Sequence, residues 1–324
     1  MSRHLKRWIY SFLGFLCLFG TVRLYYRLTD DFRLANMTYE LPFKPLWVVP
    51  TLSFDEHQHL EHILDQKFRY IGKGAQCYAF VSEDEQYVLK FFKFKHLKPN
   101  LFVEYLPPFP FLREYKQDCI GRKKRKLIGV FNGYDLAFRE NRETSQLIYL
   151  HLIPTQHLKL KVQVIDKIGL ERIIPLDDVV FLLQRKGETL RTRLRHLLDQ
   201  QQVQEAKQAM AAILEMYISE YKKGIYDHDH GILHNTGFIG QQPFHLDVGK
   251  LNQDERMQQV EFYKKDLEHV IWKMDVWMKS SYPHYYPEFS EFLAQHYQKW
   301  TGETLDLQAI DPKRFKKRRK FLGL

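Results

Sequence analysis

One stretch in the second half of the chain reads Asp227-His228-Asp229-His230-Gly231-Ile232-Leu233-His234-Asn235. Twelve residues after Asn235 it continues with Asp247-Val248-Gly249. Carboxylate and amide oxygens of this kind bind Mg²⁺ or orient a substrate hydroxyl. The segment follows Val203–Tyr221, where apolar residues recur with the 3.6-residue period of a helix and Gly224 comes after. We therefore expect a polar loop at the end of a long amphipathic helix.

A second informative segment lies upstream and reads Ile71-Gly72-Lys73-Gly74. β-rich residues flank it, and they predict a hairpin made of strands 68–71 and 78–81 with a third strand at 87–94. Glycines in such a turn let backbone N–H groups approach phosphate oxygens. Lys90, on the third strand, would add an ammonium beside the phosphates. An ordinary hairpin turn and a solvated lysine at a strand end are the alternatives.

In this order the two segments resemble the phosphate loop, lysine, catalytic loop and metal-binding aspartate of the protein-kinase-like superfamily. The resemblance covers residues 68–250 and is in outline to small atypical bacterial kinases, such as lipopolysaccharide-core or aminoglycoside kinases. It implies an α+β, bilobal fold behind an N-terminal membrane helix. The N-lobe would hold an antiparallel sheet with one helix, and the C-lobe would be helical.

The resemblance also implies cofactors and roles. ATP would bind at Gly72, Gly74 and Lys90. Glu114, on a helix predicted over 111–127, would hold Lys90 by an ion pair. Asn235 and Asp247 would supply oxygen ligands to Mg²⁺.

The acid that positions the acceptor hydroxyl is left open between two residues. The family places this aspartate five residues before the asparagine, whereas Asp229 stands six before Asn235 and Asp227 stands eight before it. We favour Asp229. Other departures are Cys77 in place of a third glycine and Gly231 in place of a lysine.

Two other functions remain open for the same residues. The irregular spacing fits a catalytically inactive pseudokinase that serves as a membrane scaffold. The Asp and His side chains of residues 227–247 also fit a metal-dependent hydrolase, although that function leaves Gly72, Gly74 and Lys90 unexplained.

The N-terminus predicts a membrane segment. Residues 8–22 carry no charge, with basic residues on both sides. The run is shorter than the ~20 residues of a typical spanning helix, but Tyr25, Tyr26 and arginines extend its reach at the interface. A cleaved signal peptide and a buried helix are the alternatives. We expect a single-pass anchor with a cytoplasmic body, since ATP is used there, and the flanking charges leave its orientation undecided.

Charge is concentrated at the two ends. The chain has 324 residues and a formal net charge of +10. Residues 1–27 hold five Lys or Arg and no acid, and residues 311–324 hold seven Lys or Arg and one acid. The body between them is close to neutral, so we expect no nucleic-acid partner. The basic tail is either solvated or bound to anionic lipid.

The chain is expected to divide into five parts. These are a membrane anchor at 1–27, a linker with a short helix at 28–67, an N-lobe at 68–187, a C-lobe at 188–310 and a basic tail at 311–324. Its three cysteines are Cys17, Cys77 and Cys119, which are too widely spaced for a disulfide framework or a zinc motif and fit a reducing compartment. The acceptor substrate is not identified by any of these patterns.

Overall fold

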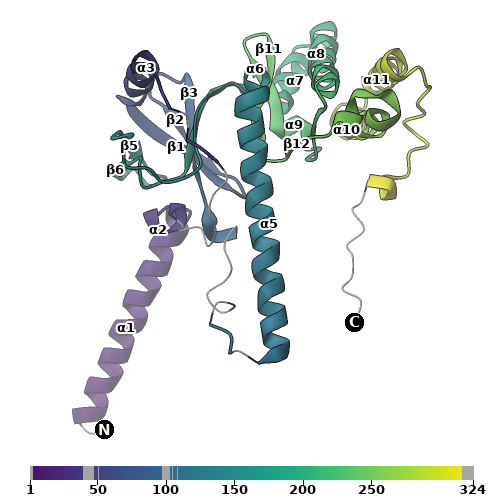
Figure 1. Ribbon diagram of the computed structural model, residues 1–324. Coiled ribbons are helices and arrows are strands. Elements are labelled where there is room, and N and C mark those ends of the chain that lie inside the picture. Colours follow the sequence, from purple (N-terminus) through teal and green to yellow (C-terminus); the bar gives the residue numbers. More distant parts are fainter. Residues whose placement is uncertain are drawn as a thin grey trace. The chain divides into compact units, whose positions relative to one another are not determined.

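The computed structural model describes residues 3–38, 47–49, 51–96, 103, 105–107 and 109–315 (Figure 1). Residues 39–46 and 50 of the predicted linker and the last nine residues of the basic tail lie outside these ranges. The chain forms two compact units, Met1–Ile128 with Leu147–Lys186, and Gly129–Gln146 with Gly187–Leu324. We call them the sheet unit and the helical unit.

The sheet unit is built on seven strands in the order β4-β7-β3-β2-β1-β5-β6. Their bounds are β1 Lys67–Lys73, β2 Cys77–Ser82, β3 Tyr87–Phe92, β4 Leu147–His151, β5 Lys161–Ile165, β6 Glu171–Pro175 and β7 Phe181–Arg185. The five strands from β4 to β1 pair antiparallel. One long helix, α5 (Pro110–Glu140), separates β3 from β4 in the sequence. This is the antiparallel sheet with one helix that the motifs predict.

The sheet also has a part that was not expected. β1 pairs in parallel with β5, and β5 forms an antiparallel hairpin with β6. The sheet therefore continues beyond its predicted antiparallel part at this edge. β6 escaped prediction because its edge position leaves only Ile174 buried, which gives a short strand with little apolar signal.

Packing in the sheet unit comes from one apolar cluster. Its aromatic centre is formed by Phe32, Phe80 and Phe91, with Phe32 4.9 Å from Phe80 and Phe80 5.7 Å from Phe91 between ring centroids. Helix α3 (Phe54–Leu64) contributes its buried apolar face to the same cluster. Ser53 caps the start of this helix and forms a capping box with Glu56, and the helix lies within the range 28–67 where a short helix is predicted.

Helix α1 (Arg3–Leu28) is long and apolar enough to cross a membrane over His4–Leu28, and none of that window is buried. Two short helices follow in this unit, α2 (Leu34–Met37) and η1 (Phe94–His96).

Helix α5 is longer than predicted. It continues past residue 127 to Glu140, and its residues from Gly129 onward belong to the helical unit. Phe131, Tyr134 and Ala137 in this extension are buried. Tertiary packing therefore outweighs the low helix propensity of Gly129 and Gly133.

The helical unit contains the remaining elements. They are α6 Arg142–Ser145, β8 Glu188–Thr189, α7 Leu190–Asp199, α8 Val203–Lys222, β9 Ile225–Asp227, α9 Ile232–Asn235, β10 Thr236–Ile239, β11 Gln242–His245, β12 Leu251–Gln253, η2 Glu255–Gln258, α10 Val260–Ser281, α11 Tyr286–Thr301 and η3 Pro312–Phe315. Helices α7, α8, α10 and α11 supply most of its apolar core. The α+β class, with a sheet unit and a helical unit, is confirmed.

Candidate active site

Gly72 and Lys90 lie in one row across the sheet, and Gly74 directly follows the end of β1. Gly72 on β1 is opposite Ala79 on β2, and Ala79 is opposite Lys90 on β3. Two strand spacings separate Gly72 from Lys90, about 10 Å. The register shifts between Tyr70 and Gly72, which indicates a bulge just before the glycines, where bulges often redirect side chains beside functional sites.

Neither glycine is required by the fold. Gly72 and Gly74 are absent from the glycines with positive φ, and a Cβ built on either one would meet nothing within 4 Å. The turn is closed by the N–H of Gly74, which donates to the carbonyl of Cys77 at 2.9 Å. Lys93, which is buried, donates its ammonium to the carbonyl of Gly74. The surface beside the glycines is open.

Lys90 is held by a residue that the sequence did not suggest. Its Nζ donates to Oε1 of Gln184 on β7 at 2.8 Å. Glu114 lies on α5 close to its start and is exposed. The ion pair between Lys90 and Glu114 stays a prediction.

The two candidate acids differ in exposure. Asp227 ends β9, pairs with Leu251 of β12 and is 1% exposed. Its Oδ1 accepts from the N–H of Asp229 at 2.7 Å, so it shapes the loop that follows. The side chain of Asp229 is 40% exposed. Of these two acids, Asp229 is the one open to a substrate.

Asp229 has a cationic partner that the motif comparison missed. Nζ of Lys250 lies 2.6 Å from its Oδ2. Lys250 directly follows Asp247-Val248-Gly249, and the β9–β12 pairing brings it back to the loop. The backbone supports this, because the N–H of His228 donates to the carbonyl of Lys250 at 3.1 Å. The sequence shows that Lys250 directly follows Gly249, but it does not show the β9–β12 pairing that brings this lysine to Asp229.

Asn235 and Asp247 lie on adjoining backbone. The carbonyl of Asn235, the last residue of α9, accepts from the N–H of Leu246 at 2.7 Å and from that of Asp247 at 3.4 Å. Oδ1 of Asp247 accepts from Tyr134 Oη and from the N–H of Gly249, both at 3.0 Å. Within the described part of the chain, no hydrogen bond is found to Oδ2 of Asp247 or to the side-chain oxygen of Asn235.

The turn at Asp247 is packed tightly from one side. Val248 is buried, and a Cβ on Gly133 of α5 would lie 2.7 Å from its carbonyl oxygen. Gly133 therefore permits the close approach that lets Tyr134 reach Asp247. Gly231 plays a similar part in the loop, since a Cβ there would lie 2.8 Å from Nδ2 of Asn235.

A buried carboxylate forms a hydrogen-bond network next to the Asp247 turn. Glu220 on α8 is fully buried and accepts hydrogen bonds from Asn141 Nδ2 at 2.6 Å, Thr144 Oγ1 at 2.9 Å and His245 Nε2 at 3.0 Å. His245 stands two residues before Asp247. The network ties α8 and the loop after α5 to the strand that leads into the Asp247 turn.

Burial changes the pKa values of two groups here. It raises the pKa of Asp227 to about 7, partly offset by the nearby His245 and the N–H of Asp229. Burial disfavours the charged form of His245, but the Glu220 carboxylate outweighs this and raises the pKa of His245 above its usual range. Asp227 is therefore largely protonated below neutral pH, a poor state for a general base.

The hydrolase interpretation needs a cluster of metal ligands. Among the residues that the structure describes, no group of three or more His, Cys, Asp or Glu side chains is placed to hold a metal ion. The alternative set of Asp and His ligands is thus not assembled in that part of the chain.

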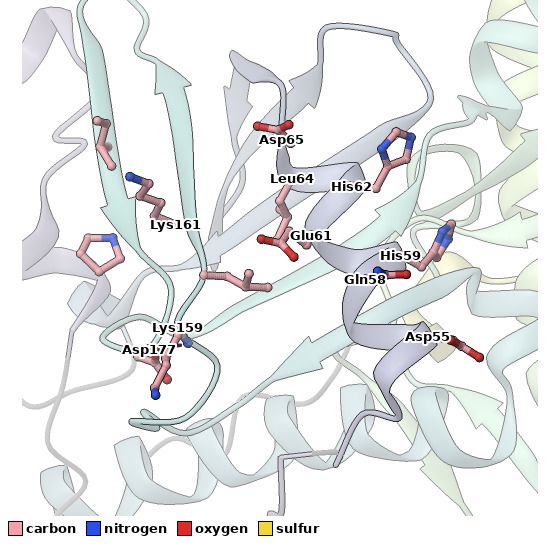
Figure 2. Close-up of a pocket in the computed structure, with 13 residues that line it drawn as sticks. Asp55, Gln58, His59, Glu61, His62, Leu64, Asp65, Lys159, Lys161 and Asp177 are labelled. Atoms are coloured by element: carbon pink, nitrogen blue, oxygen red, sulfur yellow. Dashed lines mark hydrogen bonds between the residues drawn. The ribbon is translucent and has the colours of Figure 1, made fainter.

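A wide cavity of about 1140 Å³ lies elsewhere in the sheet unit. Figure 2 shows Gln58, His59 and His62 of α3 on one side of it and Lys159 and Lys161 on the other. None of the predicted site residues lines it. The cavity is therefore separate from the motif residues.

The sequence matches no protein-family model, and no curated protein matches it. Among solved structures, WbdD in complex with a kinase inhibitor is 13% identical over 71% of this chain and 45% of WbdD, with a TM-score of 0.33. Another WbdD structure, described as a bifunctional kinase-methyltransferase, is 12% identical over 69% and 43%, with a TM-score of 0.30. The chain spans less than half the length of these WbdD chains.

APH(2″)-IIa, in a ternary complex with streptomycin and ATP, is 15% identical over 76% of this chain and 97% of that protein, with a TM-score of 0.23. The assignment below therefore depends on this chain's own residues. They define an α+β protein of two units, with a glycine–lysine row in one and an Asp/Asn loop in the other.

Proposed function

We propose that this protein is a membrane-anchored phosphotransferase that uses ATP and Mg²⁺ and transfers phosphate to a hydroxyl group. The observation that supports it most is the loop of the helical unit, which exposes Asp229; among the residues that the structure describes, no hydrogen bond is found to Oδ2 of Asp247 or to the side-chain oxygen of Asn235. These are the groups that phosphoryl transfer requires from a protein, since the reaction depends on positioning and charge stabilisation.

The sheet unit would bind the nucleotide phosphates. Gly72 and Gly74 face open space without any steric or conformational need for glycine, which is explained if phosphate occupies that space. Lys90 lies in the same row as Gly72 and adds positive charge. Ile71, at the bulge, is 53% exposed and offers an apolar surface to an adenine base.

Mg²⁺ fits the oxygens in the helical unit. This ion keeps several waters and takes only one or two protein ligands beside nucleotide phosphates. Asp247 would supply a carboxylate oxygen and Asn235 an amide oxygen. When bound, the ion would neutralise charge on the transferring phosphoryl group.

Asp229 would accept the proton of the acceptor hydroxyl. The acceptor oxygen then forms its bond to the γ-phosphorus as the bond to the β-phosphate oxygen breaks, which releases ADP. Asp227 would serve as a structural residue that orients the N–H of Asp229.

Helix α1 would anchor the protein. Its His4–Leu28 window is unburied, and the end of the helix is joined to the sheet unit, where Tyr78 Oη donates to the carbonyl of Asp31 at 2.6 Å. The body would then lie in the cytoplasm, where ATP is available.

Thermal-shift titration of the full chain in detergent with ATP and Mg²⁺ tests the proposal. A ligand at a hundred times its Kd stabilises the fold by about 2.7 kcal/mol, so a clear rise in Tm is expected. The rise should be reduced in Lys90→Ala and Asp247→Ala. Absence of any shift in the wild type would contradict nucleotide binding, and a shift without turnover would favour the pseudokinase scaffold.

Gly74→Ala is expected to weaken ATP binding while leaving the fold intact. The new methyl meets no protein atom within 4 Å, so it affects only a ligand in that space. We expect a loss of about tenfold in affinity, ~1.4 kcal/mol, measured by titration calorimetry, and an unchanged or slightly higher Tm. Gly129→Ala, which also adds a methyl in open space, is the matched control and should bind ATP normally.

Lys250→Ala is expected to reduce turnover far more than stability. Lys250 and Asp229 are both about half exposed, so their ion pair contributes at most ~1 kcal/mol to folding. Loss of a cation beside the acid should lower kcat about tenfold or more. Lys222→Ala, an exposed lysine at the end of α8, is the control. Equal turnover in the two variants would contradict a role for Lys250 in phosphoryl transfer.

A further inference from the structure

We propose that a cavity at the end of α1 binds the phosphate-bearing headgroups of anionic membrane lipids, and that the ion pair between Asp30 and Lys73 connects this site to the glycine turn. The inference rests on the proposed membrane anchoring. It adds a lipid site and a route by which the membrane surface acts on nucleotide binding.

The cavity has a volume of about 860 Å³. Six cationic side chains line it, together with two carboxylates, a tyrosine and a leucine: Arg23, Leu24, Tyr26, Arg27, Asp30, Asp31, Arg33, Lys73, Lys95 and Lys167. Lipid phosphates are the expected partners of such a cluster at a membrane surface.

The position of the cavity favours a bilayer as the source of the phosphate. Helix α1 has 26 residues, so it is ~39 Å long, and a hydrocarbon core is ~30 Å thick. The uncharged run ends at Val22, and Arg23 and Arg27 follow on the next turn and a half. A bilayer that contains the exposed apolar run therefore places its headgroups at these arginines, which line the cavity.

Asp30 and Asp31 do not neutralise the positive charge of the residues that line the cavity. Asp30 lies 2.8 Å from Lys73 and 3.1 Å from Lys167, and Asp31 binds two further cations. Among the described residues, no carboxylate lies within ion-pair distance of Arg23 or Arg27. The cluster thus keeps an excess of positive charge and two cations that a phosphate can bind without breaking an existing pair.

Asp30 is the link to the nucleotide turn. The partner of Asp30, Lys73, stands between Gly72 and Gly74 in the sequence. Oδ2 of Asp30 also accepts a hydrogen bond from Tyr70 Oη on β1 at 2.9 Å. Burial opposes its ionisation, but hydrogen bonds from Lys73, Lys167 and Tyr70 lower the pKa of Asp30 to about 2. A lipid phosphate beside Lys73 offers this lysine a second counter-ion, so lipid occupancy changes the restraint on the turn.

The test uses the full chain in nanodiscs of neutral phosphatidylcholine and in discs that also contain phosphatidylglycerol. Hydrogen exchange is measured at the amides of Arg23–Arg33 and Gly72–Gly74. We expect slower exchange at both segments in the anionic discs. The difference should be lost in the double variant Arg23→Gln/Arg27→Gln and kept in the matched control Lys222→Gln/Lys223→Gln.

Each contrary outcome has its own meaning. A chain that co-purifies with both discs but exchanges equally in them contradicts the lipid site alone. A chain that co-purifies with neither contradicts the anchoring and the site with it. Inorganic phosphate is added to the neutral discs as a further arm, and equal protection there would show a free-phosphate site instead. Because exchange needs no turnover, failure of the kinase proposal leaves this test intact.

Discussion

Asp229→Asn is expected to abolish most phosphoryl transfer without preventing ATP binding. General-base positioning contributes about 10²–10⁴-fold to such reactions, and the amide keeps the shape of the side chain but accepts no proton. The side chain is 40% exposed, so folding should change little. Turnover of ATP with the acceptor, measured beside the Tm shift with ATP and Mg²⁺, separates the lost chemistry from retained binding.

Asp227→Asn is the matched control, and it tests which acid acts. Asp227 is 1% exposed and its Oδ1 accepts from a backbone N–H, which an amide oxygen also does. We expect turnover within a few fold of wild type, which is under about 1 kcal/mol in the barrier. If Asp227→Asn were inactive and Asp229→Asn active, the two roles would have to be exchanged.

Glu220→Ala is expected to destabilise the helical unit by about 3–5 kcal/mol, the cost of removing one partner from a buried charge pair. His245 would lose its carboxylate, and Asn141 and Thr144 would lose their shared acceptor. Hydrogen exchange of the α8 amides during urea titration measures the effect. Glu220→Gln, which keeps an acceptor oxygen, should cost less, and an equal cost would contradict the role of the charge.

The same network predicts how stability depends on pH. The pKa of His245 is raised by folding, so its contribution is full below its unfolded value near 6.5 and is lost as pH rises through the higher folded value. Folding raises the pKa of Asp227 from 3.8 to about 7. Its contribution to the free energy of unfolding therefore falls as the pH rises from about 3.8 to about 7. Stability should therefore decrease from mildly acidic to mildly alkaline pH. Asp227→Asn should flatten the pH dependence of stability below pH 7. Urea unfolding of the wild type and of this variant over the same pH range checks both expectations.

Part of the sheet unit and the long helix α8 of the helical unit could be predicted from local patterns. The three strands around Gly72 and Lys90 lie close to their predicted ranges, and α8 begins at the predicted Val203. These elements owe their form to residues near one another in the sequence, so periodicity and turn chemistry were sufficient. The hairpin β5–β6 was not foreseen because its place beside β1 depends on pairing between distant segments.

The candidate site divides in the same way. Residue types and order pointed to Lys90, Asp229 and Asp247, but their partners come from long-range contacts. Lys250 reaches Asp229 through the β9–β12 pairing, and Gln184 reaches Lys90 from β7. Tyr134 lies on the part of α5 that extends beyond the predicted range 111–127. No sequence spacing carries this information, because the sheet register and tertiary packing set it.

The most direct test of the central claim is phosphoryl transfer itself. Full-length protein in nanodiscs is incubated with Mg²⁺ and ATP radiolabelled at the γ-phosphate, together with a mixture of hydroxyl-bearing lipids, sugars and proteins. We predict label in an acceptor or in released phosphate, at a rate that falls to background in Asp229→Asn and when Mg²⁺ is chelated. Label transfer that is the same in wild type and Asp229→Asn, or none in either despite ATP binding, would contradict the account.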